Sequence, residues 1–221
     1  GHSYGEWTVS KEATVEAEGE EKRVCSACGE EESKEEPFPF TDVTENQWYR
    51  EAVEYVFNNK LMNGMNATTF APDKTLTRAM LVTILYRMAG SPEVKIDNPF
   101  TDVPAGQWYT AAILWGYENS IVKGLKPDKF GPDSAVTREQ MVTFLYRYAA
   151  YAGYDVSKAV TTDISSYEDA DTISGYAVDA FAWAIGEGIV NGVGKNTLKP
   201  LGTATRAQVA KVIMVLDQKE K

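Results

Sequence analysis

The stretch that decides the fold occurs three times, as GMNATTFAPDKTLTR at 64–78, GLKPDKFGPDSAVTR at 124–138 and GVGKNTLKPLGTATR at 192–206. The pattern G-x5-(F/L)-x-P-x4-T-R aligns all three copies without a gap. The first two copies lie 60 residues apart and the last two lie 68 apart. Self-similarity at such spacing predicts a protein built from repeated supersecondary units.

The similarity extends upstream of each copy. PFTDV at 99–103 repeats the end of FPFTDV at 38–43, and the Gln-Trp-Tyr at 47–49 returns at 107–109. The third copy is looser, with YEDAD at 167–171 and Gly-Tyr-Ala at 175–177, and it needs one inserted residue. We therefore expect three repeats, at 38–90, 98–150 and 163–218, with linkers near 91–98 and 154–163.

Each repeat predicts two helices around a loop. The first helix follows from the apolar spacing after Tyr49, namely Ala52, Val53, Val56 and Phe57. Thr44 and Gln47 are placed as a capping box for it, with Val43 and Trp48 as a hydrophobic staple. The second helix begins after an N-cap threonine in each copy; these are Thr77, Thr137 and Thr205, and Gln140 and Gln208 complete capping boxes where copy one has Met80.

A pair of short helices buries too little apolar surface to fold alone. Three such pairs packed together can form a shared core. We therefore predict an all-α body over 38–218, preceded by a small β-like leader.

Composition excludes several classes of function. The 185 residues from Pro37 onward contain neither His nor Cys, so that part has no His- or Cys-based nucleophile and no His/Cys metal site. The net charge is −10, which argues against nucleic acid as a partner. No apolar run reaches the length of a membrane span, so we expect no membrane insertion. No signal sequence opens the chain, so either a secretion signal has been removed or, as we expect, the chain is an internal fragment of a longer protein.

The leader, residues 1–36, carries most of the acidity, with eleven Glu against four Lys or Arg. It also holds both cysteines, in a CSAC motif at 25–28. A zinc ribbon needs four ligands, and His2, Cys25 and Cys28 supply only three; a Gly-His start is also a common remnant of an expression tag. We predict a short hairpin with a disulfide or two thiols, with a degenerate zinc-ribbon-like module as the alternative, and no metal site or cofactor.

The arginines of the Thr-Arg pairs do not follow from helix stability. Arg78, Arg138 and Arg206 each occupy the first position of a predicted helix, where the helix dipole disfavours a cation by roughly 0.3–1 kcal/mol. Something other than helix stability should therefore explain these arginines. At an exposed helix start, replacement by alanine should hardly affect stability.

In combination, F-x-D-V, W-Y-x-x-A and G-x5-F-x-P-x4-T-R-A resemble the pattern of S-layer homology domains over about four fifths of the chain. The glutamate of the family's T-R-A-E motif is replaced here by Met80, Gln140 and Gln208. The leader is similar to small His/Cys repeats found beside such domains, with Val15 where those repeats have a cysteine.

The resemblance implies a monomeric, pseudo-threefold helical spindle outside the cell. It implies non-catalytic anchoring through grooves between repeats, which bind a secondary cell wall polysaccharide that often bears a pyruvate ketal. The ketal carboxylate would then dock at a helix start, where free N–H groups and the arginine of the Thr-Arg pair suit an anion. The residues expected to form these grooves are Arg78, Arg138, Arg206, Asp42, Asp102, Asp169, Trp48, Trp108, Tyr176, Gly64, Gly124 and Gly192.

Structural roles compete with ligand binding at these positions. The arginines could pair with Asp42, Asp102 or Asp169, the tryptophans suit a core or staple better than a sugar platform, and the glycines form turns. A protein-binding helical scaffold is a rival function, although solenoids stack at a constant period. A second rival function is that of a non-catalytic part of a larger glycoside-active surface enzyme. Catalysis would then reside elsewhere in the longer protein, since one active site does not require the same set of residues three times.

Overall fold

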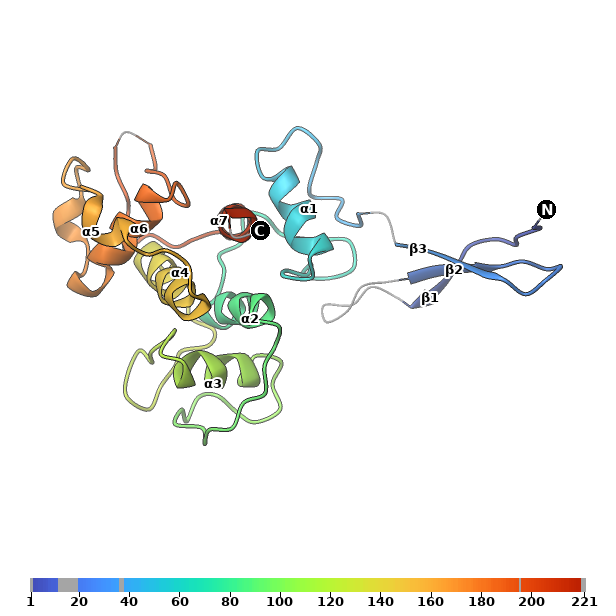
Figure 1. The fold of residues 1–221 in the computed structure, drawn as a ribbon, viewed down its shortest axis with the longest axis horizontal. Coiled ribbons are helices and arrows are strands. Elements are labelled where there is room, and N and C mark those ends of the chain that lie inside the picture. The colour runs from blue at the N-terminus through green and yellow to red at the C-terminus, as the bar shows by residue number, and fades with distance from the viewer. Residues whose placement is uncertain (1, 12–19, 36–37, 195, 220–221) are drawn as a thin grey trace. The chain divides into compact units, whose positions relative to one another are not determined.

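The computed structural model describes residues 2–11, 20–35, 38–194 and 196–219. The chain divides into two compact units, residues 1–72 and 73–221, so the boundary falls inside the first predicted repeat. The mainly helical fold with a small sheet confirms the predicted class (Figure 1). Each unit is described by itself.

The leader forms a three-stranded antiparallel sheet rather than a single hairpin. Its strands are β1 (Thr8–Lys11), β2 (Glu20–Val24) and β3 (Glu31–Glu35), in the order β1-β2-β3. Opposite charges face each other across β2 and β3, as in the Arg23–Glu32 pair. Such cross-strand pairs stabilise a small sheet that has few apolar residues. Val15 lies outside the described residues.

The rest of the first unit is built around α1 (Arg50–Asn58), whose residues Ala52, Val53 and Val56 are buried as the periodicity predicts. The predicted capping box is wrong, because the helix begins at Arg50 and its N-cap, Tyr49, makes no side-chain cap bond. Thr44 instead accepts from the backbone N–H of Gln47 in a separate turn. The staple is also wrong for Trp48, whose side chain is exposed.

In the second unit, the segments before the three Thr-Arg pairs meet in a ring. Leu76 N–H donates to Ala204 O, Ala204 N–H to Val136 O, and Val136 N–H to Leu76 O, at 2.9–3.1 Å. The three residues are equivalent positions of the three repeats, and each donates to one neighbour and accepts from the other. This closed cycle gives the centre of the unit pseudo-threefold symmetry.

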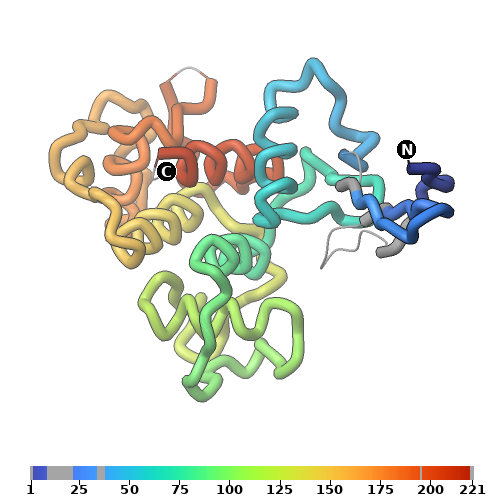
Figure 2. Tube along the Cα trace, turned by 45° about the vertical axis from the view of Figure 1, so that its right-hand side comes forward, coloured from blue at the N-terminus to red at the C-terminus, as the bar shows by residue number. Residues whose placement is uncertain are grey.

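Long helices radiate from the ring. They are α2 (Arg78–Met88), α4 (Arg138–Ala152) and α7 (Arg206–Lys219), and the first helices of repeats two and three are α3 (Thr110–Glu118) and α6 (Val178–Gly186). Figures 1 and 2 both show α3 beside α2 and α6 beside α4, and these pairs share the most extensive helix contacts of this group. The second helices of repeats one and two thus pack on the first helices of repeats two and three, respectively.

The predicted linker at 154–163 is folded. It contains a helical turn, α5 (Lys158–Thr161), which packs on α6, and two 3-10 turns follow, Ala170–Thr172 and Gly175–Ala177. Trp183 Nε1 donates to Asp155 O at 3.2 Å. The eight extra residues between copies two and three therefore add a cap on α6 rather than a free connection.

Candidate ligand grooves at the repeat junctions

The threonines of the Thr-Arg pairs cap helices as predicted. Thr77 Oγ1 accepts from Met80 N–H, and Thr137 forms a complete capping box with Gln140. Thr205 does the same with Gln208, accepting at 3.3 Å and donating from its own N–H at 3.1 Å. The capping residues were predictable because each bond closes over only three residues.

The helix starts do not offer free N–H groups, contrary to the sequence-based expectation. Arg78 N–H donates to Ser134 O and Ala79 N–H to Pro132 O, both in the loop of the next repeat. Arg138 and Glu139 repeat these bonds with Gly202 and Pro200. An anion therefore cannot dock on the backbone of α2 or α4, and the arginine side chains are the remaining donors.

The arginines are also not exposed, since Arg78, Arg138 and Arg206 are only 2%, 7% and 4% accessible. Arg78 reaches into the loop of repeat two, where Nε donates to Phe130 O at 3.0 Å and Nη2 to Lys123 O at 2.7 Å. The rings of Phe130 and Phe144 lie 4.6 Å and 5.1 Å from its guanidinium carbon. Replacement by alanine would thus disturb the fold, because it removes bonds between repeats.

Arg138 makes the equivalent contacts one repeat further on. Its Nε donates to Leu198 O at 2.7 Å and its Nη2 to Asn191 O at 3.2 Å. Arg206 N–H donates to Lys74 O. The backbone N–H at each of the three helix starts is therefore bonded to a carbonyl group of another repeat.

The guanidinium groups of Arg78 and Arg138 carry a charge that no carboxylate neutralises directly. Within the described residues neither forms a salt bridge, and neither Nη1 atom forms a hydrogen bond. These Nη1 atoms are also not among the fully buried unpaired polar atoms, of which the described chain has one, Trp115 Nε1. Burial lowers the pKa of Arg78 to about 10 and lowers that of Arg138. Each arginine is thus buried as a whole, while its Nη1 atom stays available to donate a hydrogen bond to a ligand.

The three aspartates hold the loops rather than the arginines. Asp102 accepts from Phe130 N–H and Gly131 N–H, both at 2.8 Å. Burial raises the pKa of Asp102, but backbone hydrogen bonds, chiefly those from Phe130 and Gly131, together with the charge of Lys129 lower its pKa overall. The equivalent clamps are Asp42 on Phe70 and Ala71, and Asp169 on Leu198 and Lys199. Asp102 and Asp169 therefore position the Phe130 and Leu198 carbonyl groups to which Arg78 and Arg138 donate.

The aromatic residues expected at the grooves are solvent-accessible. Trp48, Trp108 and Tyr176 are 59%, 51% and 52% exposed, so a core role is excluded for them. Trp48 and Trp108 lie edge-on to Tyr49 and Tyr109. Burial lowers the pKa of Arg78, and electrostatic interactions with Tyr176 and Asp102 offset part of this effect. The surroundings of Arg78 thus include residues from all three repeats.

Glu139 is a residue of this region that the sequence analysis missed. It is buried at the second position of α4, and it accepts from Ser174 N–H, Ser174 Oγ and Tyr176 Oη at 2.8–3.2 Å. Burial and this bond to Glu139 raise the pKa of Tyr176. The signal was present in the aligned motif, because copies one and three have Ala79 and Ala207 at this position.

The motif glycines have a packing role. A Cβ on Gly124 would meet the carbonyl oxygen of Lys126, that of Lys129 at 2.6 Å and the ring of Phe100 at 2.9 Å. Gly64 is confined in the same way by Asn66, Thr69 and Phe40. At Gly192 the contacts are looser, 3.1 Å to Tyr167 and 3.2 Å to Thr197 O. The glycines let each loop fold tightly over the aromatic residue of its F-x-D or Y-x-D sequence.

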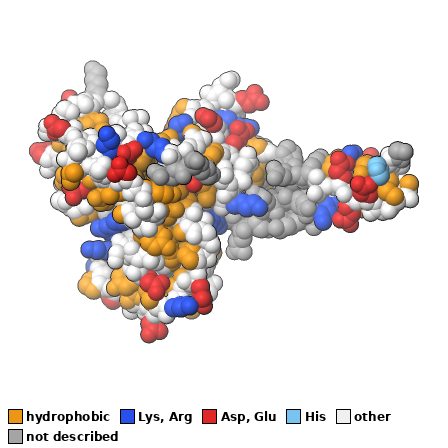
Figure 3. Space-filling view, in the orientation of Figure 1, with side chains coloured by type: hydrophobic (Ala, Val, Ile, Leu, Met, Phe, Trp, Pro, Cys, Tyr) orange, Lys and Arg blue, Asp and Glu red, His pale blue; other side chains and the backbone are white. Residues whose placement is uncertain are grey.

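The leader brings His2, Cys25 and Cys28 together, although they are up to 26 residues apart. Both cysteines are free thiols, Cys25 buried and Cys28 exposed. Hydrogen bonds from backbone N–H groups, chiefly that of Ala27, outweigh the opposing effect of burial and lower the pKa of Cys25 to about 6. In Figure 3 the pale-blue histidine lies beside acidic side chains.

Together, the central ring and its junctions define a small module made of three homologous helical repeats. The S-layer homology domain profile matches residues 39–79, 99–142 and 166–210, and the chain belongs to this family. It is accordingly a non-catalytic anchoring module of an extracellular, cell-wall protein, of a kind that binds cell-wall polymers. None of the described helices has the length and apolarity needed to cross a bilayer.

Relatives fall into two groups. The chain is 32% identical over 180 residues to an exoglucanase XynX of Acetivibrio thermocellus, which is 81% of this chain and 16% of that protein. It is also 32% identical over 180 residues to an amylopullulanase of Thermoanaerobacterium thermosulfurigenes, which is 81% of this chain and 10% of that protein. A surface-layer 125 kDa protein of Lysinibacillus sphaericus is 30% identical over 166 residues, which is 74% of this chain and 13% of that protein. The chain thus spans less than a fifth of the length of these curated relatives.

Proposed function

We propose that the junctions between repeats bind an anionic secondary cell wall polysaccharide, and that the group recognised is the carboxylate of a pyruvate ketal. The observation that carries the proposal is that Arg78 and Arg138 are buried cations whose Nη1 atoms lack a hydrogen-bond partner among the residues that the structure describes. Each guanidinium group is buried and forms neither a hydrogen bond from Nη1 nor an ion pair with a carboxylate within the described chain. Asp102 and Asp169 act on Arg78 and Arg138 only through longer-range electrostatics. A buried charge that is only partly compensated is unfavourable, and a ligand carboxylate would stabilise it through a charge-assisted hydrogen bond.

The groove at Arg78 is the one we propose to be best equipped for a sugar. Tyr176 lies near the guanidinium and presents an exposed ring, against which a pyranose face can pack. The guanidinium cannot swing away, because Nε and Nη2 are bonded to Phe130 and Lys123. A donor fixed in advance loses little entropy on binding.

The test uses the full chain and three preparations of purified cell walls: intact walls, walls whose ketal groups have been hydrolysed by mild acid, and walls stripped of all polymer other than peptidoglycan. We expect the chain to co-sediment with intact walls only. Binding to acid-treated walls at wild-type strength would overturn recognition of the ketal carboxylate. Binding to stripped walls would overturn the polysaccharide proposal as a whole, because it would make peptidoglycan itself the ligand.

We further propose that the module acts as a monomer and tethers a longer polypeptide to the wall. Three repeats already supply the three members of the ring, so no second chain is needed to complete it. The names of the exoglucanase and amylopullulanase relatives favour a glycoside-active enzyme as cargo. Light scattering of the purified chain tests the first statement, and a dimer or trimer at micromolar concentration would contradict it.

A further inference from the structure

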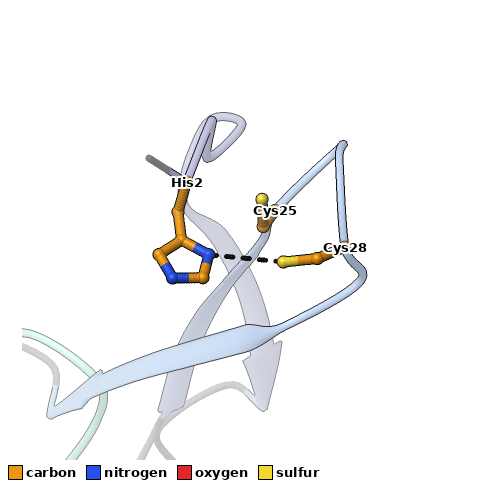
Figure 4. Close-up of side chains that lie close together, drawn as sticks. All are labelled: His2, Cys25 and Cys28. Atoms are coloured by element: carbon orange, nitrogen blue, oxygen red, sulfur yellow. Dashed lines mark hydrogen bonds between the residues drawn. The ribbon is translucent and has the colours of Figure 1, made fainter.

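The end of the leader sheet gathers three side chains that are typical metal ligands. Cys25 follows β2 directly, Cys28 closes the turn after it, and His2 comes from the segment that pairs alongside (Figure 4). Their ligand atoms, one nitrogen and two sulfurs, all lie within 4.8 Å of one another. Within the described residues this is the one His/Cys group of its kind, and it takes no part in the repeat junctions.

The backbone fixes this arrangement. Cys25 N–H donates to Glu30 O at 2.8 Å and Gly29 N–H donates to Cys25 O at 2.9 Å, which closes a tight turn. Gly29 has a φ of 75°, a left-handed conformation that glycine adopts without strain. On the other side, Tyr4 is bridged to Cys25, and Ser26 N–H donates to Ser3 O. The two cysteines and the segment carrying the histidine are thus held by main-chain bonds.

The separations suit a tetrahedral metal. His2 Nδ1 lies 3.3 Å from Cys28 Sγ. Zinc bonds of about 2.3 Å to sulfur and 2.0–2.1 Å to nitrogen place such atoms roughly 3.6 Å apart in tetrahedral geometry. The observed distance needs to widen by only a few tenths of an ångström.

The polar surroundings favour a cation as well. Ser3 N–H donates to Cys25 Sγ at 3.3 Å, and an N–H group directed at sulfur stabilises the thiolate that a metal requires. Glu30 Oε2 lies 3.1 Å from His2 Nδ1, which adds a carboxylate at the same place. The ring of His2 stacks on Tyr4, with centroids 5.6 Å apart, so it is oriented toward the turn.

We propose that His2, Cys25 and Cys28 bind one zinc-type divalent metal ion, with an oxygen ligand from Glu30 or solvent in the fourth position. Thiolate and imidazole ligands select zinc over magnesium or calcium. The metal would serve as a staple for a three-stranded sheet that is too small to be stable through a core of its own. A Cys25–Cys28 disulfide is the competing fate of the same thiols.

The experiment begins with the full chain, reduced and freed of metal with a chelator, and titrated with cobalt(II). We expect one equivalent to produce a thiolate-to-metal charge-transfer band together with the intense visible bands of four-coordinate cobalt, and zinc to abolish both. A weak spectrum without the charge-transfer band would overturn the proposal. So would a disulfide in the isolated chain that, once reduced, leaves thiols without metal affinity.

Variants locate the site. Cys28→Ser and His2→Gln should each weaken binding by more than the roughly 10–100-fold that loss of an outer-shell partner causes. Glu6→Gln, which removes an exposed carboxylate of the same leader, is the matched control and should bind as the wild type does. Cys25→Ser is less informative because Cys25 is buried. Wild-type affinity in both ligand variants would contradict the assignment.

Discussion

Arg78 donates from Nε to the carbonyl oxygen of Phe130, 52 residues further along the chain, and its guanidinium carbon lies 4.6 Å from the Phe130 ring centroid. Arg138 donates in the same way to Leu198, 60 residues away. The arginine of one repeat therefore fastens the loop of the next repeat, while its Nη1 atom remains available. One side chain thus holds the junction together and supplies the cation that we propose for ligand binding.

We predict that Arg78→Lys weakens both stability and wall binding. Lysine keeps the charge but lacks the planar fork, so it cannot serve Phe130 O and Lys123 O together. The free energy of unfolding should fall by about 1–3 kcal/mol, and affinity for walls should fall by at least roughly tenfold. Denaturant unfolding and co-sedimentation measure the two effects. Arg87→Lys, in the last turn of α2, is the control; unchanged behaviour of Arg78→Lys in both assays would contradict the dual role.

We predict that Glu139→Gln strengthens binding of an anionic glycan near Arg78. Glutamine keeps one acceptor oxygen for Ser174 Oγ and Tyr176 Oη, loses the acceptor of the Ser174 N–H, and removes a negative charge from a site proposed for an anion. An increase in affinity of roughly three- to tenfold is expected, equivalent to about 1 kcal/mol. Isothermal titration with the solubilised polymer measures it, and weaker binding by a variant of unchanged stability would rule the effect out.

A third prediction concerns the residue with a left-handed backbone conformation that directly follows Phe130 in repeat two and Leu198 in repeat three. Lys199 has a φ of 49°, is exposed, and occupies the position of Gly131 in repeat two, whose φ is 74°. Lys199→Gly should therefore raise the free energy of unfolding by roughly 0.5–1 kcal/mol. The reciprocal Gly131→Ala should lower it by at least about 1 kcal/mol, because its Cβ would also meet the Leu125 side chain. Chemical denaturation of both variants measures the two changes in the free energy of unfolding. Changes of the same sign would refute the argument from backbone strain.

A fourth prediction concerns pH. At neutral pH, Asp102→Asn should lower the free energy of unfolding by about 1–3 kcal/mol, because one acceptor for Phe130 and Gly131 is lost. The folded-state pKa of Asp102 is lowered, so its contribution is complete above the unfolded value of about 3.9 and is lost as pH falls through the folded pKa. The difference from wild type should therefore be constant down to about pH 5 and shrink below about pH 4. Asp97→Asn, an exposed carboxylate, is the control, and a difference that grows toward low pH would contradict the sign.

We predict that the leader is dispensable for anchoring. Deleting residues 1–36 removes the sheet and the His2 and Cys cluster but none of the three repeats. Co-sedimentation with walls should match the full chain, and a large loss of binding would show that the leader takes part.

A calorimetric melt of the shortened chain also tests whether residues 38–218 unfold as one cooperative domain, as the repeats predict. Three separate transitions would contradict this prediction.

Some parts of this structure were open to prediction because they are local. The threonine caps close over three residues, and the buried faces of α1, α2, α4 and α7 follow from apolar spacing. The prediction failed for Thr44 and Trp48, where a turn intervenes before α1. A cap motif fixes a helix start only when the intervening residues adopt helical dihedral angles, and here they do not.

The sequence by itself determined the repeats, the family and the helix starts at Thr77, Thr137 and Thr205. Only the tertiary structure decided that the arginines are buried, that their acceptors are carbonyl groups 45 to 60 residues away, and that the aspartates bind loops instead. It also decided that His2 meets Cys28 across 26 residues. The physical reason is that apolar periodicity specifies which face of a helix is buried, whereas the partner on that face depends on how distant segments close around a common centre.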